Sequence, residues 1–269
     1  MAGVSSRPAP RRRTVLALCA VPVAGLLAVA ALAPLPFAVA QPGVTADVLG
    51  EHRGEPVITV SGREPVERGE DGRLLMTTIA ATTPETPVRL ADVVSGWFAR
   101  DRAVMPKEAV YPTGDSPAEI RRHNTRQMER SQDAAVSAAL RQLRLSEGDV
   151  DVELRLSDIG GPSAGLLFAL GLVETLDGDG RGGELTGGRV IAGTGTIRPD
   201  GTVGPVGGVP LKTQAARRDG ATVFLVPEAE CAVAKAQLPE GLRLVPVRTL
   251  NGAVDALKAL DDGGPVPSC

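Results

Sequence analysis

The N-terminal segment divides the chain into two unequal parts. Residues 1–13 hold four arginines and no acidic residue, and residues 14–40 form a stretch of 27 residues without a charged side chain. A helix needs about 20 apolar residues to cross a bilayer, and basic residues before the span keep that end in the cytoplasm. The sequence therefore predicts that residues 41–269 lie on the outer side of the cytoplasmic membrane.

Two interpretations of this segment stay open. Ala38-Val39-Ala40 before Gln41 resembles a signal-peptidase site, which would make the segment a cleaved signal and the protein secreted. The apolar run is longer than the roughly 7–15 residues of a typical signal core. Its length favours a retained anchor, and hence a single-pass membrane protein with an extracellular domain.

Helical and strand patterns interleave over the exported chain without a regular strand–helix–strand repeat, which indicates an α+β fold rather than a Rossmann sheet. Ser116, Pro117 and Glu119 form a capping-box helix start. An apolar run over 162–176 predicts a helix buried on nearly all sides. The expected helices span 91–98, 116–143, 162–176, 210–218 and 250–260, and the expected strands span 57–60, 74–79, 150–156, 190–197, 223–226 and 244–247.

Composition argues against two classes of function. Beyond residue 40 the chain carries 25 basic and 32 acidic residues, and only 2% of the whole chain is aromatic. Nucleic-acid binding requires basic grooves and stacking platforms, so nucleic acid is not an expected partner. The histidines are His52 and His123 alone, too few and too far apart for a typical metal site. We expect neither a metal nor another cofactor.

Two cysteines belong to the exported part, Cys231 and Cys269. In an oxidising compartment they could form one disulfide that ties down the C-terminal tail. Two unpaired thiols are the alternative, and the sequence does not decide between them.

The motif with the clearest chemical meaning is Gly160-Gly161-Pro162-Ser163-Ala164-Gly165. Proline suits a helix start, so Ser163 is expected in the first turn of the buried helix. Backbone N–H groups around Gly160, Gly161 and Ala164 could stabilise an oxyanion there. A serine that only caps its helix is the alternative interpretation.

A nucleophilic serine needs a base. The motif also fits G-x-S-x-G of α/β-hydrolases, but that fold places its histidine after the serine, and both histidines precede Ser163. No S-x-x-K motif occurs either. Lys212 follows Gly207-Gly208 in the first turn of an expected helix, where apolar neighbours and the helix dipole would lower its pKa toward that of a general base. An ordinary surface lysine is the alternative.

Together the motifs resemble the proteolytic domain of Lon proteases. The resemblance is carried by Gly161–Gly165, Thr194-Gly195 and Gly207-Gly208 before Lys212, and Met128–Ala135 is similar to the helix that precedes the catalytic region. It implies a Ser–Lys dyad, with Ser163 as nucleophile, Lys212 as base and Thr194 orienting the lysine. It also implies a domain over 57–262, after an anchor or signal over 1–40 and a linker over 41–56, and before a tail over 263–269.

The chain departs from Lon in one motif position. Where Lon usually carries an acidic residue three before the serine, this chain has Gly160, with Asp158 two further back. That form is similar to membrane-anchored, ATP-independent Lon-like proteases. Those proteins usually carry a PDZ domain before the serine motif, for which residues 144–157 are too few. Ring assembly, commonly a hexamer, is implied by the resemblance.

The sequence thus predicts an ATP-independent serine endopeptidase that cleaves unfolded or flexible proteins or peptides. The ATP-binding pattern G-x-x-x-x-G-K-[ST] is absent from the sequence. Two alternatives share the same fold, a non-catalytic binding or regulatory module and a protease that cuts only its own chain.

Overall fold

The computed structural model describes residues 12–67, 69, 71–111, 116–146, 148–156 and 161–269. Its helices are α1 Arg12–Leu32, α2 Leu90–Phe98, α3 Lys107–Val110, α4 Pro117–Leu143, α5 Gly165–Leu176, α6 Val209–Arg218, α7 Cys231–Ala236 and α8 Leu250–Asp261, with 3₁₀ turns at Pro162–Ala164 and Glu228–Glu230. Its strands are β1 Phe37–Asp47, β2 Glu51–His52, β3 Glu55–Pro56, β4 Ile58–Ser61, β5 Arg73–Ala81, β6 Ala103–Pro106, β7 Asp151–Leu154, β8 Val190–Gly193, β9 Thr196–Ile197, β10 Val203–Gly204, β11 Val223–Pro227 and β12 Arg243–Val247.

A mixed six-stranded sheet forms the centre of the domain, in the order β12-β11-β8-β5-β1-β6. The strands from β12 to β5 pair in parallel, whereas β1 pairs antiparallel with both β5 and β6. Helices and strands therefore mix without a regular repeat, and the predicted α+β fold is confirmed.

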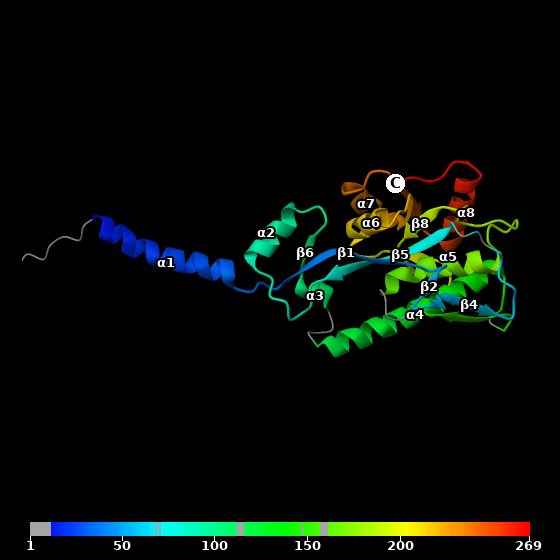
Figure 1. The fold of residues 1–269 in the computed structure, drawn as a ribbon, viewed down its shortest axis with the longest axis horizontal. Coiled ribbons are helices and arrows are strands. Elements are labelled where there is room, and N and C mark those ends of the chain that lie inside the picture. The colour runs from blue at the N-terminus through cyan, green and yellow to red at the C-terminus, as the bar shows by residue number, and fades with distance from the viewer. Residues whose placement is uncertain (1–11, 68, 70, 112–115, 147, 157–160) are drawn as a thin grey trace, which may run out of the picture.

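Helices cover both faces of the sheet (Figure 1). Side chains alternate between the faces of a strand, and Leu74, Met76 and Ile191 belong to one core cluster with α4, α5 and α8. Leu75, Ala192 and Phe224 face the other way and pack with α6 and α7 in a second cluster. The sheet thus separates α5 from α6.

The helix α5 is buried along its whole length, as the apolar run over 162–176 predicted. Ser116 is the N-cap of α4, but its side chain makes no capping hydrogen bond, so the predicted capping box does not form. On α4, Met128, Ala135 and Ala139 are buried against the core.

The predicted linker over 41–56 is a strand and a small hairpin. Residues 41–47 of that range belong to β1. They pair with β5, with an irregularity between Pro42 and Thr45. Proline and glycine suggested a linker, but Pro42 and Gly43 sit at the irregularity, where a strand tolerates them. Residues 37–40, which the sequence assigned to the N-terminal segment, are also part of β1.

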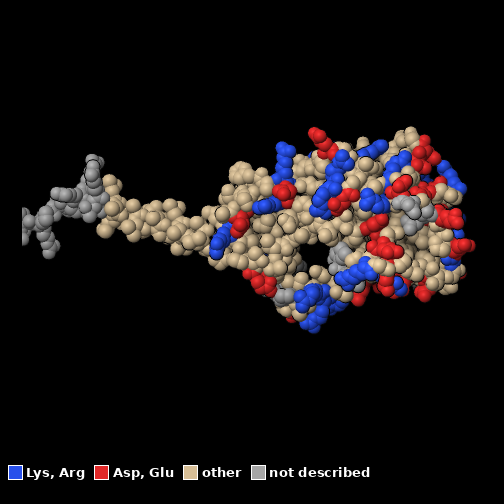
Figure 2. Space-filling view, viewed as in Figure 1, with Lys and Arg blue, Asp and Glu red and all other residues tan. Residues whose placement is uncertain are grey.

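The N-terminal helix α1 projects from the domain (Figure 1). Residues Val15–Leu32 have a mean hydropathy of 2.6 and none of that window is buried. No charged side chain interrupts Val15–Leu32, and Figure 2 shows the projecting helix without charged groups, whereas charged residues cover the body. By length and composition this helix fits a membrane anchor or a signal sequence.

Candidate active site

The candidate site lies at the carboxyl end of β8, where α5 and α6 approach from opposite faces of the sheet. The Thr194 N–H still donates to the Leu225 carbonyl of β11 at 3.1 Å, which is the last bond of β8 to the sheet. The chain then leaves the ladder, and the Gly195 N–H donates to the Ser163 carbonyl, 2.8 Å away. This break divides the predicted strand over 190–197 into β8 and β9. Ser163 is thereby fixed to the connection between the two strands.

Ser163 lies in the 3₁₀ turn immediately before α5, as predicted, and is half-buried. Ser131 and Ile197 pack closely against this turn. The Ser131 hydroxyl of α4 donates to the Pro162 carbonyl at 3.1 Å, and a Cβ on Gly165 would lie 2.8 Å from both Ser131 Oγ and Ile197 Cγ2. Only glycine at this position permits such close packing.

Lys212 is buried on α6, with 3% of its surface exposed. The helix begins after Gly208, which adopts a left-handed conformation (φ 71°) and lies against Ile79. The Lys212 N–H donates to the Gly208 carbonyl, so the lysine belongs to the first turn, as predicted.

Thr194 connects the serine turn to the lysine. Its side chain is fully buried. The Lys212 ammonium donates to Thr194 Oγ1 at 3.0 Å, and the same hydroxyl donates to the Ser163 carbonyl at 3.2 Å. The structure thus brings the Ser163 turn, Thr194 and Lys212 together, although one lies before α5, one follows β8 and one lies on α6.

Burial lowers the pKa of Lys212 from 10.5 to about 8, and the negative charge of Glu230 partly opposes this by raising it. Desolvation disfavours the charged form of an amine, so an appreciable fraction of Lys212 is neutral near neutral pH. A pKa close to the working pH is what a general base requires.

The predicted oxyanion donors are only partly described. Gly160 lies outside the described residues. The Ala164 N–H donates to the Gly161 carbonyl at 3.3 Å, which engages one predicted donor within the turn. Among the described residues of the three, Gly161 is the one whose N–H remains a candidate oxyanion donor.

The structure joins Cys231 and Cys269 in a disulfide. Cys231 opens α7 directly after Glu230, so the bridge connects the C-terminus to the part of the chain beside Lys212. Among the described residues, no group of three or more His, Cys, Asp or Glu side chains could hold a metal ion.

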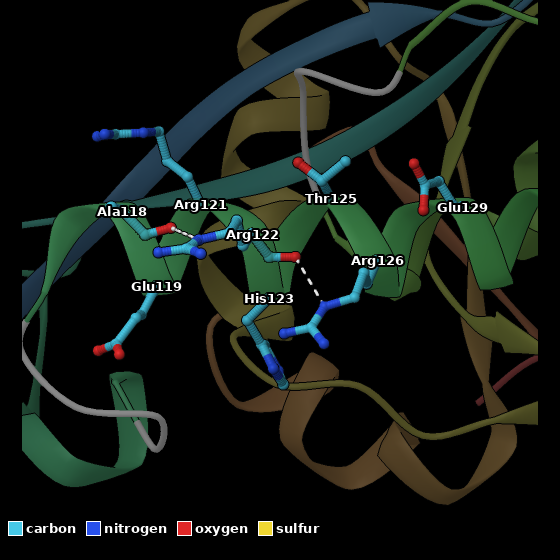
Figure 3. Close-up of a pocket in the computed structure, with 8 residues that line it drawn as sticks. All are labelled: Ala118, Glu119, Arg121, Arg122, His123, Thr125, Arg126 and Glu129. Atoms are coloured by element: carbon cyan, nitrogen blue, oxygen red, sulfur yellow. Dashed lines mark hydrogen bonds between the residues drawn. The ribbon is translucent and has the colours of Figure 1, made fainter.

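A hollow lies along the exposed N-terminal half of α4 (Figure 3). Its lining includes His123 and three arginines, and the Arg126 guanidinium folds back onto the Arg122 carbonyl at 3.2 Å. None of Ser163, Thr194 and Lys212 lines it. We therefore separate this hollow from the candidate active site.

One structural residue of the site was not assigned by the sequence. Ser131 carries no catalytic pattern, but it lies three residues after Met128 and four before Ala135, on the face of α4 that packs into the core. The helical spacing placed it inward, and only the tertiary structure shows that it meets the Ser163 turn.

Comparisons with known proteins identify the type of domain that holds these residues. Residues 146–257 match the family model of the Lon protease (S16) C-terminal proteolytic domain, a range that includes Ser163, Thr194 and Lys212. The chain therefore carries a Lon-like protease domain.

A curated relative agrees with this assignment. The chain is 29% identical over 126 residues, 45% of its length, to Lon protease 2 of Bacillus subtilis (strain 168). It spans 21% of the length of that relative, so the similarity concerns one domain of a larger protein.

Proposed function

We propose that the protein is a serine endopeptidase in which Ser163 is the nucleophile, Lys212 the general base and Thr194 the residue that orients Lys212. The observation that carries this proposal is the buried Thr194 hydroxyl, which binds the Lys212 ammonium and the Ser163 carbonyl together. A capping serine and a surface lysine, the two alternatives, would require neither this link nor a buried amine.

In the proposed reaction, neutral Lys212 accepts the proton of the Ser163 hydroxyl while Ser163 Oγ attacks the carbonyl carbon of a peptide. The negative charge on the carbonyl oxygen is stabilised by backbone N–H groups, of which Gly161 is the described candidate. The C–N bond then breaks and Lys212 returns its proton to the leaving amine. Water, deprotonated by Lys212, hydrolyses the acyl-enzyme and restores Ser163.

We propose flexible or unfolded proteins and peptides as substrates. The pattern G-x-x-x-x-G-K-[ST] is absent from the sequence, and a protease domain that does not itself hydrolyse ATP cannot drive the unfolding of a stable protein. We therefore expect the protein to cleave without ATP and to prefer unfolded chains.

We place the domain on the outer side of the cytoplasmic membrane, with α1 as a retained anchor. The orientation rests on the arginines that precede the span. Retention is supported by β1, because Ala38 and Ala40 are 2% and 0% exposed within the sheet. Cleavage after Ala40 would remove the part of β1 that pairs with β6.

The test is digestion of an unfolded, fluorescently labelled casein by the full-length protein in detergent micelles without ATP. We expect cleavage by wild type and loss of at least about 1,000-fold in the variants S163A and K212M. Lys235→Met is the matched control, since Lys235 is an exposed lysine on the neighbouring helix α7, and it should cleave normally.

A serine-directed fluorophosphonate separates the alternatives. A peptidase labels at Ser163, whereas a binding module neither labels nor cleaves. A self-processing enzyme would leave casein intact but produce a fragment of its own chain, at a rate independent of concentration and absent in S163A. Either of these results would contradict the proposal.

A further inference from the structure

The helix α2 carries an apolar stripe on its exposed side. Leu90, Val94, Trp97 and Phe98 follow the spacing i, i+4, i+7, i+8, which places them along one face of a helix. All four are exposed, and Trp97 and Phe98 reach 73% and 86%. Aromatic side chains left in water to this extent mark an interaction surface.

The opposite side of α2 is already used for folding. Val93 and Gly96 are buried, and a Cβ on Gly96 would lie 2.6 Å from Val104 Cγ2 of β6. The helix is therefore held by its small-residue face while its aromatic face points away from the domain.

Backbone hydrogen bonds tie this helix to the end of α1. The Leu35 N–H donates to the Val88 carbonyl at 2.8 Å, two residues before α2, and the Lys107 N–H donates to the Pro36 carbonyl at 3.1 Å. α1 also contacts α2, and Figure 1 shows α2 between α1 and the body. The position of α2 is thus fixed by the point where the chain leaves α1.

The length of α1 determines where the end of this helix lies relative to a membrane. The 18 residues of Val15–Leu32 extend about 27 Å as a helix, close to the roughly 30 Å hydrocarbon thickness of a bilayer. If α1 spans the membrane, its last residue, Leu32, lies at the membrane surface, and residues 33–36 and α2 lie at headgroup level. Tryptophan at the end of an amphipathic helix is enriched at this level.

The charges around the stripe fit an anionic surface. Arg89 precedes α2, and Arg100 and Arg102 follow it, all three exposed. Within residues 89–102 the acidic residues are Asp92 and Asp101. Asp92 accepts from the Arg89 N–H at 2.8 Å and caps the helix, and Asp101 stands between two of the arginines. Exposed arginines beside an apolar face favour anionic lipid.

We propose that α2 is a membrane-interface helix, which inserts Val94, Trp97 and Phe98 into the outer leaflet beside the anchor and holds the domain against the bilayer. The inference rests on the proposed membrane location of α1 and is independent of the Ser–Lys chemistry. The Gln214 amide of α6 donates to the Arg100 carbonyl at 2.7 Å, which connects the docked segment to the helix that carries Lys212.

The test uses Trp97, the one tryptophan of the chain, as its own probe. Full-length S163A protein is reconstituted in vesicles of phosphatidylcholine and phosphatidylglycerol, with bromine at shallow or deep acyl positions. We expect emission shifted to shorter wavelength, protection from iodide, and at least about twofold stronger quenching by shallow than by deep bromines. F98S should shift the emission to longer wavelength, whereas V233S, a change of an exposed apolar residue on α7 (47%), should not.

The outcomes are distinct. Protein that floats with vesicles but whose tryptophan emits as in water and is quenched by iodide overturns the proposal and leaves the anchor intact. Protection from iodide without quenching by bromine, dependent on the protein-to-lipid ratio, would instead assign the stripe to a second copy. Failure to float would overturn both the anchor and α2, while the activity of the wild-type protein in micelles tests the catalytic proposal separately.

Discussion

The ammonium of Lys212 lies 3.0 Å from the hydroxyl of Thr194, and both side chains are buried. In the proposed mechanism, this pair would allow an amine, rather than a histidine, to activate the serine. Burial lowers the pKa of the amine to about 8, and the hydroxyl would orient it toward the turn that contains Ser163.

Thr194→Val tests the orienting role. It removes the acceptor for Lys212 but keeps the Gly195–Ser163 backbone bond, so we expect kcat to fall about 10- to 100-fold with little change in KM. Thr194→Ser retains the hydroxyl and should recover most of the rate. Equal losses in both variants would indicate a packing role instead.

The activity should rise with pH. Lys212 acts as a base only when neutral, and a pKa of about 8 makes kcat/KM increase from pH 6.5 and level off above about pH 9. Steady-state rates on a peptide substrate, with enzyme stability checked at each pH, measure this. Glu230→Gln removes the charge that raises this pKa, so its profile should move to lower pH. A profile that is flat between pH 6.5 and 9 would contradict Lys212 as the base.

Lys212→Met should make the domain inactive and more stable at pH 7. The pKa of Lys212 is lower in the folded state than in the unfolded chain, so the unfolded state binds more protons between about pH 8 and 10.5. Wild type therefore gains stability as pH rises through this window, and the full penalty applies below it. The difference between 10.5 and about 8 corresponds to an upper limit of about 3 kcal/mol.

Urea unfolding in micelles at pH 7 and pH 10 measures this effect. The advantage of the methionine variant should be largest at pH 7 and shrink at pH 10. Lys235→Met, at an exposed position, should differ from wild type at neither pH.

Gly165→Ala should destabilise the serine turn. The added methyl group would meet Ser131 Oγ and Ile197 Cγ2 at 2.8 Å, an overpacking cost of about 1–3 kcal/mol that exceeds the roughly 0.5–1 kcal/mol gained in helix propensity. We expect a lower midpoint of unfolding and reduced kcat. Gly207→Ala, where nothing lies within 4 Å, is the control and should retain stability.

Cys269→Ser should lower stability without direct loss of catalysis. The disulfide joins residues separated by 38 positions, for which loop-closure entropy gives an upper value of about 4 kcal/mol. Thermal unfolding with and without reductant measures the loss, and reductant should affect wild type alone. Cys19→Ser, at the free cysteine of α1, should behave as wild type.

The sequence predicted the elements around the site better than it predicted β1. Glycine and proline beside Ser163 and Lys212 specify helix starts by local geometry, and the positions of α5 and α6 follow from them. The role of β1 was not predicted, because its alanines, Pro42 and Gly43 have weak strand propensity. Its pairing with β5 and β6 depends on contacts distant in sequence.

The connection of Ser163 to Lys212 illustrates the same limit. Each residue has a local signal, but their link passes through Thr194, at the place where β8 leaves the ladder. The prediction of that link came from resemblance to Lon and not from spacing. Likewise, Ser131 and the stripe on α2 acquire meaning only from what surrounds them in space.

The short connection between α1 and the sheet has a consequence for substrate choice. Residues 33–36 alone separate the two elements, and they are hydrogen-bonded on both sides. If α1 is a retained anchor, as proposed, this connection leaves almost no tether, and Ser163 would stay at a nearly constant height above the lipid. Under that proposal we expect the protein to cut a freely diffusing chain or the membrane-proximal stalk of a neighbour, but not a loop that lies far above the membrane on a tall ectodomain.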